Sequence, residues 1–216
     1  MQNYQLIIFD WDGTLMDSVA RIVSSLQGAA RATSLEQPCF DSAKQVIGLS
    51  LPKAMQTLFP DEQHLHEQLM GQYKHHYREL DTTPTPLFEH AHELLHGLKD
   101  AQKLLAVATG KGRSGLERVW QQSNTGHYFH ASRCADESVS KPHPDMVHSL
   151  LSELSVAPEQ AIMIGDTSFD LEMAQRAGVD SIGVTHGVHS NEALSQYGPK
   201  AIVDSLPELA QLLLPK

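Results

Sequence analysis

The stretch Leu6-Ile7-Ile8-Phe9-Asp10-Trp11-Asp12-Gly13-Thr14 predicts a buried strand that ends in two carboxylates. Successive strand side chains point to opposite faces, so an extended chain places Asp10 and Asp12 on one face and Trp11 on the other. Two carboxylates at the carboxyl end of a buried strand are costly unless a cation or a reaction uses them. Aspartate and glycine are also ordinary turn residues, so this stretch alone fits a simple strand-to-turn junction equally well.

The composition is that of a globular protein: 216 residues, of which 41% are hydrophobic and 19% are charged. No apolar run approaches the roughly 18 residues that span a bilayer, and the amino terminus lacks a secretory pattern, so we expect no membrane association. A formal charge of −10 argues against broad nucleic-acid binding. Two distant cysteines, Cys39 and Cys134, do not predict a disulfide framework. We therefore expect a cytoplasmic protein, and a monomer and a homodimer both stay open.

Short apolar runs alternate with helix-like segments in the second half of the chain, which predicts a parallel sheet covered by helices on both faces. The fold class that follows is α/β, with a three-layer parallel-sheet (Rossmann-like) core. We expect about five strands, at Leu6 to Phe9, Leu104 to Ala108, Ala161 to Ile164, Ser181 to Val184 and Ala201 to Val203, and a further one near Tyr128 to Ser132. The expected helices span Gly115 to Gln122, Asp145 to Leu154, Ser168 to Ala177, Asn191 to Tyr197 and Pro207 to Leu214.

Residues 17–83 interrupt this alternation with helix signals and no strand pattern. Ser18, with Asp17, is suited to cap a first helix, and further helices are expected to begin at Asp41 and Asp61. The proline-rich segment of residues 81–86 then reads as a linker or hinge. We therefore expect two domains: an α/β core of residues 1–16 and 84–216, and a small all-α domain of residues 17–83 inserted after the first strand.

Three further motifs follow expected strands, and each allows two interpretations. Thr109-Gly110-Lys111-Gly112-Arg113 can hold a phosphate through a hydroxyl and free N–H groups, or can be an ordinary glycine-bearing turn. Lys141, before Pro142, has a restricted backbone, but a surface lysine beside a helix-opening proline would look the same. Asp166 and Asp170 should lie close together at the start of a helix; helix capping by Asp166 accounts for only one of them.

Taken together, Asp10-x-Asp12-Gly-Thr, Thr109, Lys141-Pro and Gly165-Asp166-x-x-x-Asp170 resemble the four motifs of the haloacid dehalogenase-like hydrolase superfamily. The motifs stand in the order of that family, and the resemblance covers essentially the whole chain. The helical insertion resembles the cap of the phosphoglycolate phosphatase and β-phosphoglucomutase branch. Asp12 argues against the dehalogenase branch, whose chemistry is metal-free.

The resemblance implies catalytic and metal-binding roles for four aspartates. Asp10 is the implied nucleophile, which becomes an aspartyl phosphate, and Asp12 is the implied general acid and base. The implied cofactor is Mg²⁺, bound by the Asp10 carboxylate, the Asp12 backbone carbonyl and Asp166. Asp170 is expected to support that ion, directly or through water.

The resemblance also implies a phosphate site and a cap that selects the substrate. Thr109, the Gly110 N–H and Lys141 are expected to hold the phosphoryl oxygens. The segment from Ile47 to Lys53 resembles the specificity loop of the cap, which makes Ser50 and Lys53 candidates for substrate selection.

The function implied is Mg²⁺-dependent hydrolysis of a small phosphate ester, as in a phosphoglycolate phosphatase. The first alternative is a phosphosugar mutase. The β-phosphoglucomutases bind a second phosphate with a specificity-loop arginine, and Leu51 stands at the comparable position here, which argues against that activity. The second alternative is a non-catalytic phosphate-binding protein, which the intact set of acidic motifs disfavours. Phosphoglycolate, sugar phosphates and nucleoside monophosphates all stay open as substrates.

Overall fold

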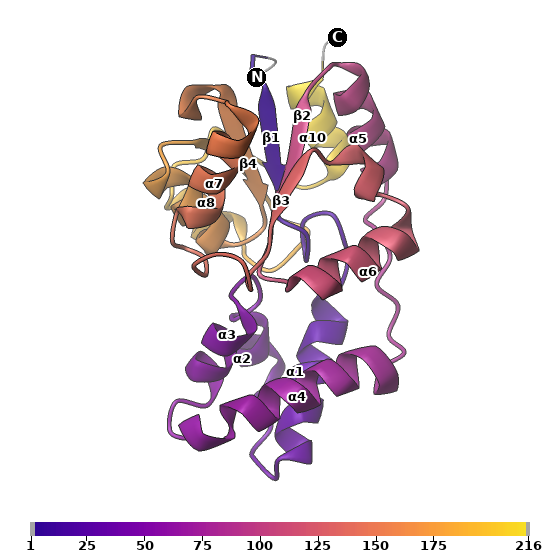
Figure 1. The fold of residues 1–216 in the computed structure, drawn as a ribbon, viewed down its shortest axis with the longest axis vertical. Coiled ribbons are helices and arrows are strands. Elements are labelled where there is room, and N and C mark those ends of the chain that lie inside the picture. Colours follow the sequence, from indigo (N-terminus) through magenta and orange to yellow (C-terminus); the bar gives the residue numbers. More distant parts are fainter. Residues whose placement is uncertain (1–2, 215–216) are drawn as a thin grey trace.

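The computed structural model describes residues 3–214 and contains a six-stranded parallel sheet in the order β3-β2-β1-β4-β5-β6. β1 lies at the centre, with Phe9 paired to Val107 of β2 on one side and to Ile164 of β4 on the other (Figure 1). The expected parallel sheet is confirmed, including the additional strand. That strand begins at Ala131, because Tyr128 belongs to a 3-10 helix, η3 (Gly126–Tyr128). The strands are β1 (Leu6–Phe9), β2 (Leu104–Ala108), β3 (Ala131–Arg133), β4 (Ala161–Gly165), β5 (Asp180–Val184) and β6 (Ala201–Val203).

The two faces of the sheet pack against separate layers of helices, as the alternation of side chains along a strand requires. Leu6 and Ile8 belong to the hydrophobic cluster beneath α7 and α8, whereas Ile7 and Phe9 belong to the cluster beneath α5, α6 and α10. This arrangement confirms the three-layer core. Its helices are α5 (Ala91–Asp100), α6 (Arg113–Ser123), α7 (Asp145–Leu154), α8 (Ser168–Arg176), α9 (Asn191–Ser195) and α10 (Leu206–Leu213), with the short η4 (Pro158–Gln160).

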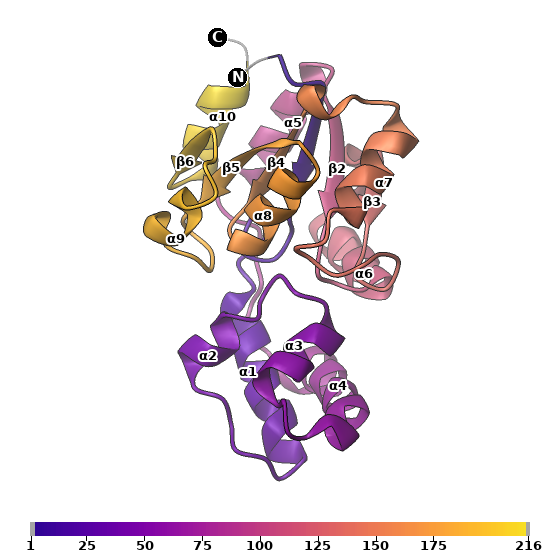
Figure 2. The ribbon, with the colours of Figure 1, turned by 90° about the vertical axis from the view of Figure 1, so that its left-hand side faces the viewer.

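Between β1 and β2 the chain forms a group of helices with its own hydrophobic cluster, here called the helical insertion (residues 17–83). The insertion lies beyond the carboxyl ends of the strands (Figures 1 and 2). One member of its cluster comes from the core: Val188, in the loop after β5, is 6% exposed. The elements of the insertion are α1 (Val19–Ala32), α2 (Phe40–Lys44), α3 (Leu51–Leu58), η1 (Gln63–Leu65), α4 (His66–His75) and the π-helix η2 (His76–Leu80).

Some local expectations were wrong. Ser18 precedes α1, but its side chain makes no cap hydrogen bond, because its hydroxyl donates to Asp12 instead. α2 begins at Phe40, one residue before the expected start at Asp41, and Cys39 is its N-cap. α5 was not predicted, although its apolar residues Leu94, Leu95 and Leu98 pack on the sheet.

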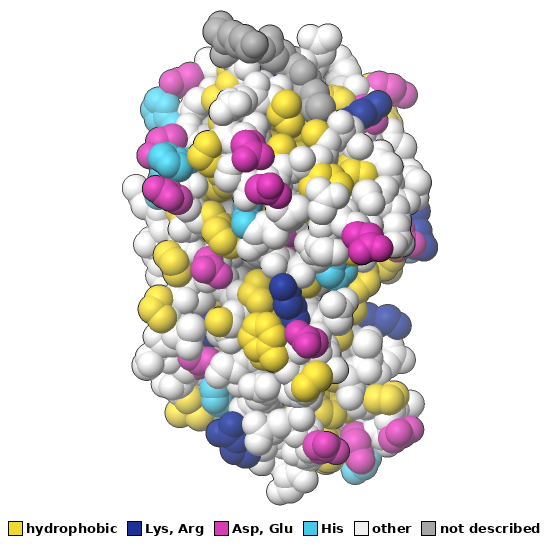
Figure 3. Space-filling model, turned by 180° about the vertical axis from the view of Figure 1, so that it is seen from behind, with side chains coloured by type: hydrophobic (Ala, Val, Ile, Leu, Met, Phe, Trp, Pro, Cys, Tyr) yellow, Lys and Arg dark blue, Asp and Glu magenta, His cyan; other side chains and the backbone are white. Residues whose placement is uncertain are grey.

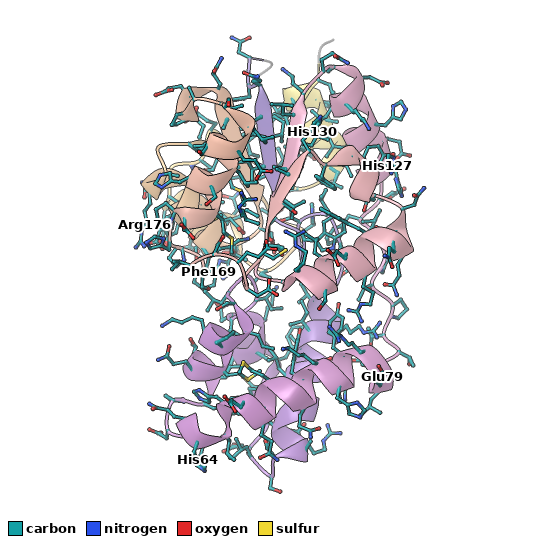
Figure 4. The ribbon with its side chains drawn as sticks, viewed as in Figure 1. His64, Glu79, His127, His130, Phe169 and Arg176 are labelled. Carbon is teal, nitrogen blue, oxygen red and sulfur yellow. The ribbon has the colours of Figure 1, made fainter. Side chains whose placement is uncertain are left out.

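Acidic side chains lie scattered over both the core and the helical insertion on the rear face of the molecule, rather than in one patch (Figure 3). The histidines labelled in Figure 4 are equally dispersed: His64 lies at the end of the insertion remote from the core, and His127 and His130 lie near the opposite end of the molecule.

Phe169 marks the edge of the core that faces the insertion (Figure 4). The candidate site is at this junction.

Candidate active site

Three buried carboxylates converge at the carboxyl edge of the sheet. Asp10 follows β1 and Asp166 follows the neighbouring strand β4, and Asp170 lies in the first turn of α8. The strand order reverses between β1 and β4, which is where open parallel sheets bind ligands. One carboxylate oxygen from each aspartate lies within 4.8 Å of the others, and none of the three residues is more than 1% exposed.

Hydrogen bonds fix the carboxylates of Asp10 and Asp166 but leave Asp10 Oδ2 without a partner among the described residues. Asp10 Oδ1 accepts from the Trp11 N–H at 2.6 Å, and Asp10 Oδ2 is buried without a hydrogen-bond partner in the described structure. Asp166 accepts from the Thr14 hydroxyl at 2.8 Å and from the Val188 N–H at 2.9 Å. The free oxygen of Asp10 is therefore the atom of this group that is available to a ligand or a reaction.

Lys141 lies between two of the carboxylates and is itself only 1% exposed. Its Nζ is 2.9 Å from Asp10 Oδ1 and 2.6 Å from Asp170 Oδ1. The other oxygen of Asp170 accepts from the N–H and the hydroxyl of Thr167, which forms a capping box with Asp170 at the start of α8. Asp170 therefore also caps the start of α8, a role that the sequence interpretation did not include.

Burial makes the ionised forms of Asp10 and Asp166 unfavourable in the metal-free chain. Burial raises the pKa of Asp10 well above its usual range; Lys141 opposes the shift, and Asp170 and Asp166 add to it. Burial, followed by the charge of Asp170, raises the pKa of Asp166 to about 7. Burial alone would lower the pKa of Lys141, but the charges of Asp10 and Asp170 outweigh it and raise the pKa above its usual value. One lysine thus faces more negative charge than it offsets.

Asp12 has a different environment from Asp10, although both line the same cavity. Its Oδ1 accepts from the Ser18 hydroxyl at 2.6 Å and lies 2.9 Å from Lys111 Nζ. Burial alone would lower the pKa of Lys111, but the charge of Asp12, the nearby Tyr77 and the hydrogen bond to Asp12 together outweigh burial and raise the pKa. Trp11 packs in the apolar core, so the two aspartates and the tryptophan separate as strand alternation predicted.

The loop after β2 lies against the helical insertion. Thr109 is fully buried. Both Thr109 and Gly110 line the cavity. A Cβ on Gly110 would lie 2.6 Å from the carbonyl oxygens of Gly48 and Leu49, so a side chain there cannot fit the present arrangement. Gly13 is similarly constrained: its φ is +81°, and a Cβ would lie 2.2 Å from Asp166 Oδ2.

The cavity between the core and the helical insertion has a volume of about 550 Å³, within the usual range for small-molecule sites. Ser50 is buried beside it, where its N–H donates to the Ser140 hydroxyl at 2.9 Å. Lys53 lies on the exposed side of α3, donates to Gln56 and is not part of the cavity lining. The two residues proposed for substrate selection therefore make contacts outside the cavity.

Three residues at the site were not predicted from the sequence to belong to it: Ser18, Lys111 and Arg118. Lys111 stands two residues after Thr109 in the same motif, and that position was the available signal. Ser18 was interpreted as a helix cap, a role that its residue type fits equally well. Arg118 lies in α6, and only the three-dimensional structure brings it to the cavity.

The fold and the acidic site define a hydrolase of the haloacid dehalogenase-like class, and sequence and structure comparisons agree. A model of the family "Haloacid dehalogenase-like hydrolase" matches residues 7–184. The "Probable phosphatase IndB" of Dickeya dadantii is 35% identical over 209 residues, which cover 94% of this chain and 91% of the relative. The "Phosphoglycolate phosphatase" of Vibrio vulnificus strain YJ016 is 29% identical over 223 residues, covering 99% and 97%.

A solved structure gives the same result. The hydrolase of the haloacid dehalogenase-like family from Streptococcus pneumoniae superposes with a TM-score of 0.86 at 26% identity, covering 98% of this chain and 99% of its own. The chain belongs to the haloacid dehalogenase-like hydrolase family. Within residues 3–214, no helix combines the length and the apolar character that crossing a bilayer requires.

Proposed function

We propose that the protein is a Mg²⁺-dependent phosphomonoesterase that hydrolyses a small phosphate ester through an aspartyl phosphate on Asp10. One observation carries the proposal: Asp10 Oδ2 is buried without a hydrogen-bond partner in the described part of the chain, in a group of three carboxylates beside a buried lysine. The phosphatase names of the relatives support the same reaction class.

The donor set fits a hard divalent cation. Carboxylate and carbonyl oxygens are the ligands that Mg²⁺ prefers, and the three convergent carboxylates exceed the charge that Lys141 supplies. We assign the ion to the carboxylates of Asp10 and Asp166 and the backbone carbonyl of Asp12. Asp170, whose oxygens accept from Lys141 and Thr167, supports this group by its charge. When bound, the ion supplies positive charge that offsets the repulsion between a phosphoryl group and the carboxylates.

The chain itself supplies the nucleophile, the proton transfers and the phosphate contacts. Asp10 attacks phosphorus in line, and the bond between phosphorus and the leaving oxygen breaks as Asp12 donates a proton to that oxygen. Asp12 then accepts a proton from the water that hydrolyses the aspartyl phosphate, which restores both residues. The phosphoryl oxygens are held by the Thr109 hydroxyl, the Gly110 N–H and Lys141.

We further propose that residues 17–83 act as a cap over a core of residues 1–16 and 84–216. Arg21, in α1, donates to the carbonyl oxygens of Tyr77 and Thr83, so it ties the two chain connections of the insertion together. A cap in this position excludes water during transfer to Asp10 and selects the leaving group.

The test is phosphate release from a panel of phosphoglycolate, sugar phosphates and nucleoside monophosphates with Mg²⁺ near neutral pH. Asp10→Asn should abolish release while the circular dichroism spectrum and Tm show an intact fold. Asp180→Asn is the matched control, because Asp180 lies at the amino end of β5, opposite the site. Substantial turnover by the Asp10→Asn protein would contradict the mechanism.

A further inference from the structure

Within residues 3–214, Arg118 is the one arginine whose side chain makes no hydrogen bond. Arg21 and Arg78, which lie near it, are both engaged: Arg21 with the backbone of Tyr77 and Thr83, and Arg78 with the Ser114 hydroxyl at 3.0 Å. Arg118 Nε is buried and has no hydrogen-bond partner among the described residues. The Arg118 side chain as a whole is half-buried, and a buried donor without a partner is costly unless a ligand accepts from it.

Tyr77 supplies a second unused donor at the same place. The tyrosine is 6% exposed, and its hydroxyl is buried without a partner in the described structure. Arg118 Cζ lies 5.3 Å from the centre of the Tyr77 ring, and Lys111 Nζ lies at the same distance from it. Tyr77, Arg118 and Lys111 all line the 550 Å³ cavity that contains Asp10 and Asp12. The cavity thus has a cationic, hydrogen-bonding region apart from the three convergent carboxylates.

This region is built for an anion rather than for a neutral group. Arginine matches carboxylate and phosphate oxygens with paired donors, and hydrogen bonds between charged groups are stronger than neutral ones. Lys111 is already paired with Asp12, so the unused donors are those of Arg118 and Tyr77. The cavity is also lined by apolar residues of the helical insertion, among them Ile22, Leu26 and Ala54.

We propose that Arg118 and Tyr77 bind a second anionic group on the alcohol portion of the substrate. The proposal rests on the proposed phosphatase function, since Asp10 takes the phosphate that is cleaved. The substrate class is a phosphate monoester whose leaving group carries a carboxylate or a second phosphate, with its carbon skeleton against the apolar residues of the insertion.

Matched substrates test the anion. In the first pair, 3-phosphoglycerate and glycerol 3-phosphate differ by a carboxylate in place of a hydroxymethyl group. In the second, propane-1,3-diol bisphosphate and its monophosphate differ by the second phosphate. For at least one pair, kcat/KM of the wild type should favour the anionic member by about tenfold or more, which corresponds to about 1.4 kcal/mol. The pair that shows the preference identifies the anion as carboxylate or phosphate.

Variants assign the preference to the proposed residues. Arg118→Gln should reduce the ratio of the two kcat/KM values to within about threefold of unity, and Arg118→Lys should retain part of it. Tyr77→Phe should reduce the ratio less, because it removes a single neutral donor. Arg176→Gln, which changes an exposed arginine of α8, is the control and should keep the wild-type ratio.

Binding separates failure of this inference from failure of the proposed function. Isothermal titration calorimetry with the Asp10→Asn protein measures the same pairs without turnover. If the wild type hydrolyses nothing but Asp10→Asn binds the anionic members more tightly through Arg118, the phosphatase proposal fails and the anion site stands. Equal affinities and equal kcat/KM within both pairs would overturn the anion site, as would an equal loss for both members in Arg118→Gln.

Discussion

In the metal-free protein, the Tm of Asp166→Asn relative to that of the wild type should be higher at pH 8 than at pH 5. Burial and the charge of Asp170 raise the pKa of Asp166 to about 7, whereas an unfolded aspartate titrates near about 3.9. A carboxyl whose pKa is raised on folding holds its proton more tightly in the native state. Its contribution to stability is therefore fully present below about pH 4 and is lost as the pH rises to about 7.

The magnitude follows from the pH interval. Each pH unit between 5 and the native pKa removes about 1.36 kcal/mol from the free energy of unfolding, which gives a maximum of about 2.7 kcal/mol between pH 5 and pH 8. Water penetration and side-chain relaxation around an ionised carboxylate reduce this maximum, so we expect about 1 to 2.5 kcal/mol, or about 2–10 °C in Tm for a chain of this size.

Asparagine also alters the hydrogen bonds from Thr14 and Val188, but that cost is independent of pH. The informative quantity is therefore the Tm difference between Asp166→Asn and wild type, measured in EDTA at pH 5 and again at pH 8. Asp180→Asn, whose carboxylate pairs with Lys200 on the surface, is the control and should show no such change. Added Mg²⁺ at pH 8 should raise the Tm of the wild type and not that of Asp166→Asn, because a ligand stabilises only the state that binds it.

The same Tm difference at pH 5 and pH 8 would refute the reasoning. It would mean that Asp166 stays ionised in the folded chain without a cation, and that the neighbouring carboxylates do not set the charge of the site.

Three other predictions concern the loop contact, the thiols and the metal. Gly110→Ala should lower kcat/KM about 5- to 150-fold, because its Cβ would overlap the Gly48 carbonyl and overpacking costs about 1–3 kcal/mol. Gly112→Ala, where the nearest atoms to the new Cβ belong to the Asp136 side chain, is the control, and an unchanged kcat/KM for Gly110→Ala would contradict the prediction. Cys39 should be alkylated by iodoacetamide at pH 8, because it is exposed and its pKa is lowered by the Ser42 hydrogen bonds. Cys134 should not react, because burial raises its pKa to about 12; mass spectrometry of the folded protein distinguishes the two sites. Ca²⁺ should replace Mg²⁺ poorly in phosphate-release assays, since its higher and looser coordination disturbs in-line geometry, and equal rates with both ions would count against the proposed metal role.

Much of the core could be predicted from the sequence because buried parallel strands are continuous apolar runs, and β1, β2 and β6 have the expected bounds. The acidic residues could be placed near one another because Asp10 and Asp166 each follow a strand, and strand ends of a parallel sheet share an edge. The hydrogen bond between Lys141 and Asp170 could not be derived, because it joins side chains 29 positions apart through the packing of α8.

The insertion was harder to interpret than the core. Ser18 fits a helix cap and a partner of Asp12 equally well by residue type, and only the tertiary structure decides between them. Arg118 has no local signal, since an arginine on an amphipathic helix usually faces solvent. Its position opposite Tyr77 depends on how the insertion meets α6.

Val188 links the hydrophobic cluster of the insertion to the acidic site of the core. Its side chain completes the hydrophobic cluster of the insertion, and its N–H donates to Asp166. Swinging the insertion outward would return this valine to water, at about 1.5–3 kcal/mol for a fully buried side chain. That cost corresponds to roughly a 10- to 150-fold preference for the shut arrangement even before substrate arrives. If the insertion opens as the proposed cap, the rate at which product leaves would depend on this apolar contact together with the hydrogen bonds of Ser50 and Arg78 across the same junction.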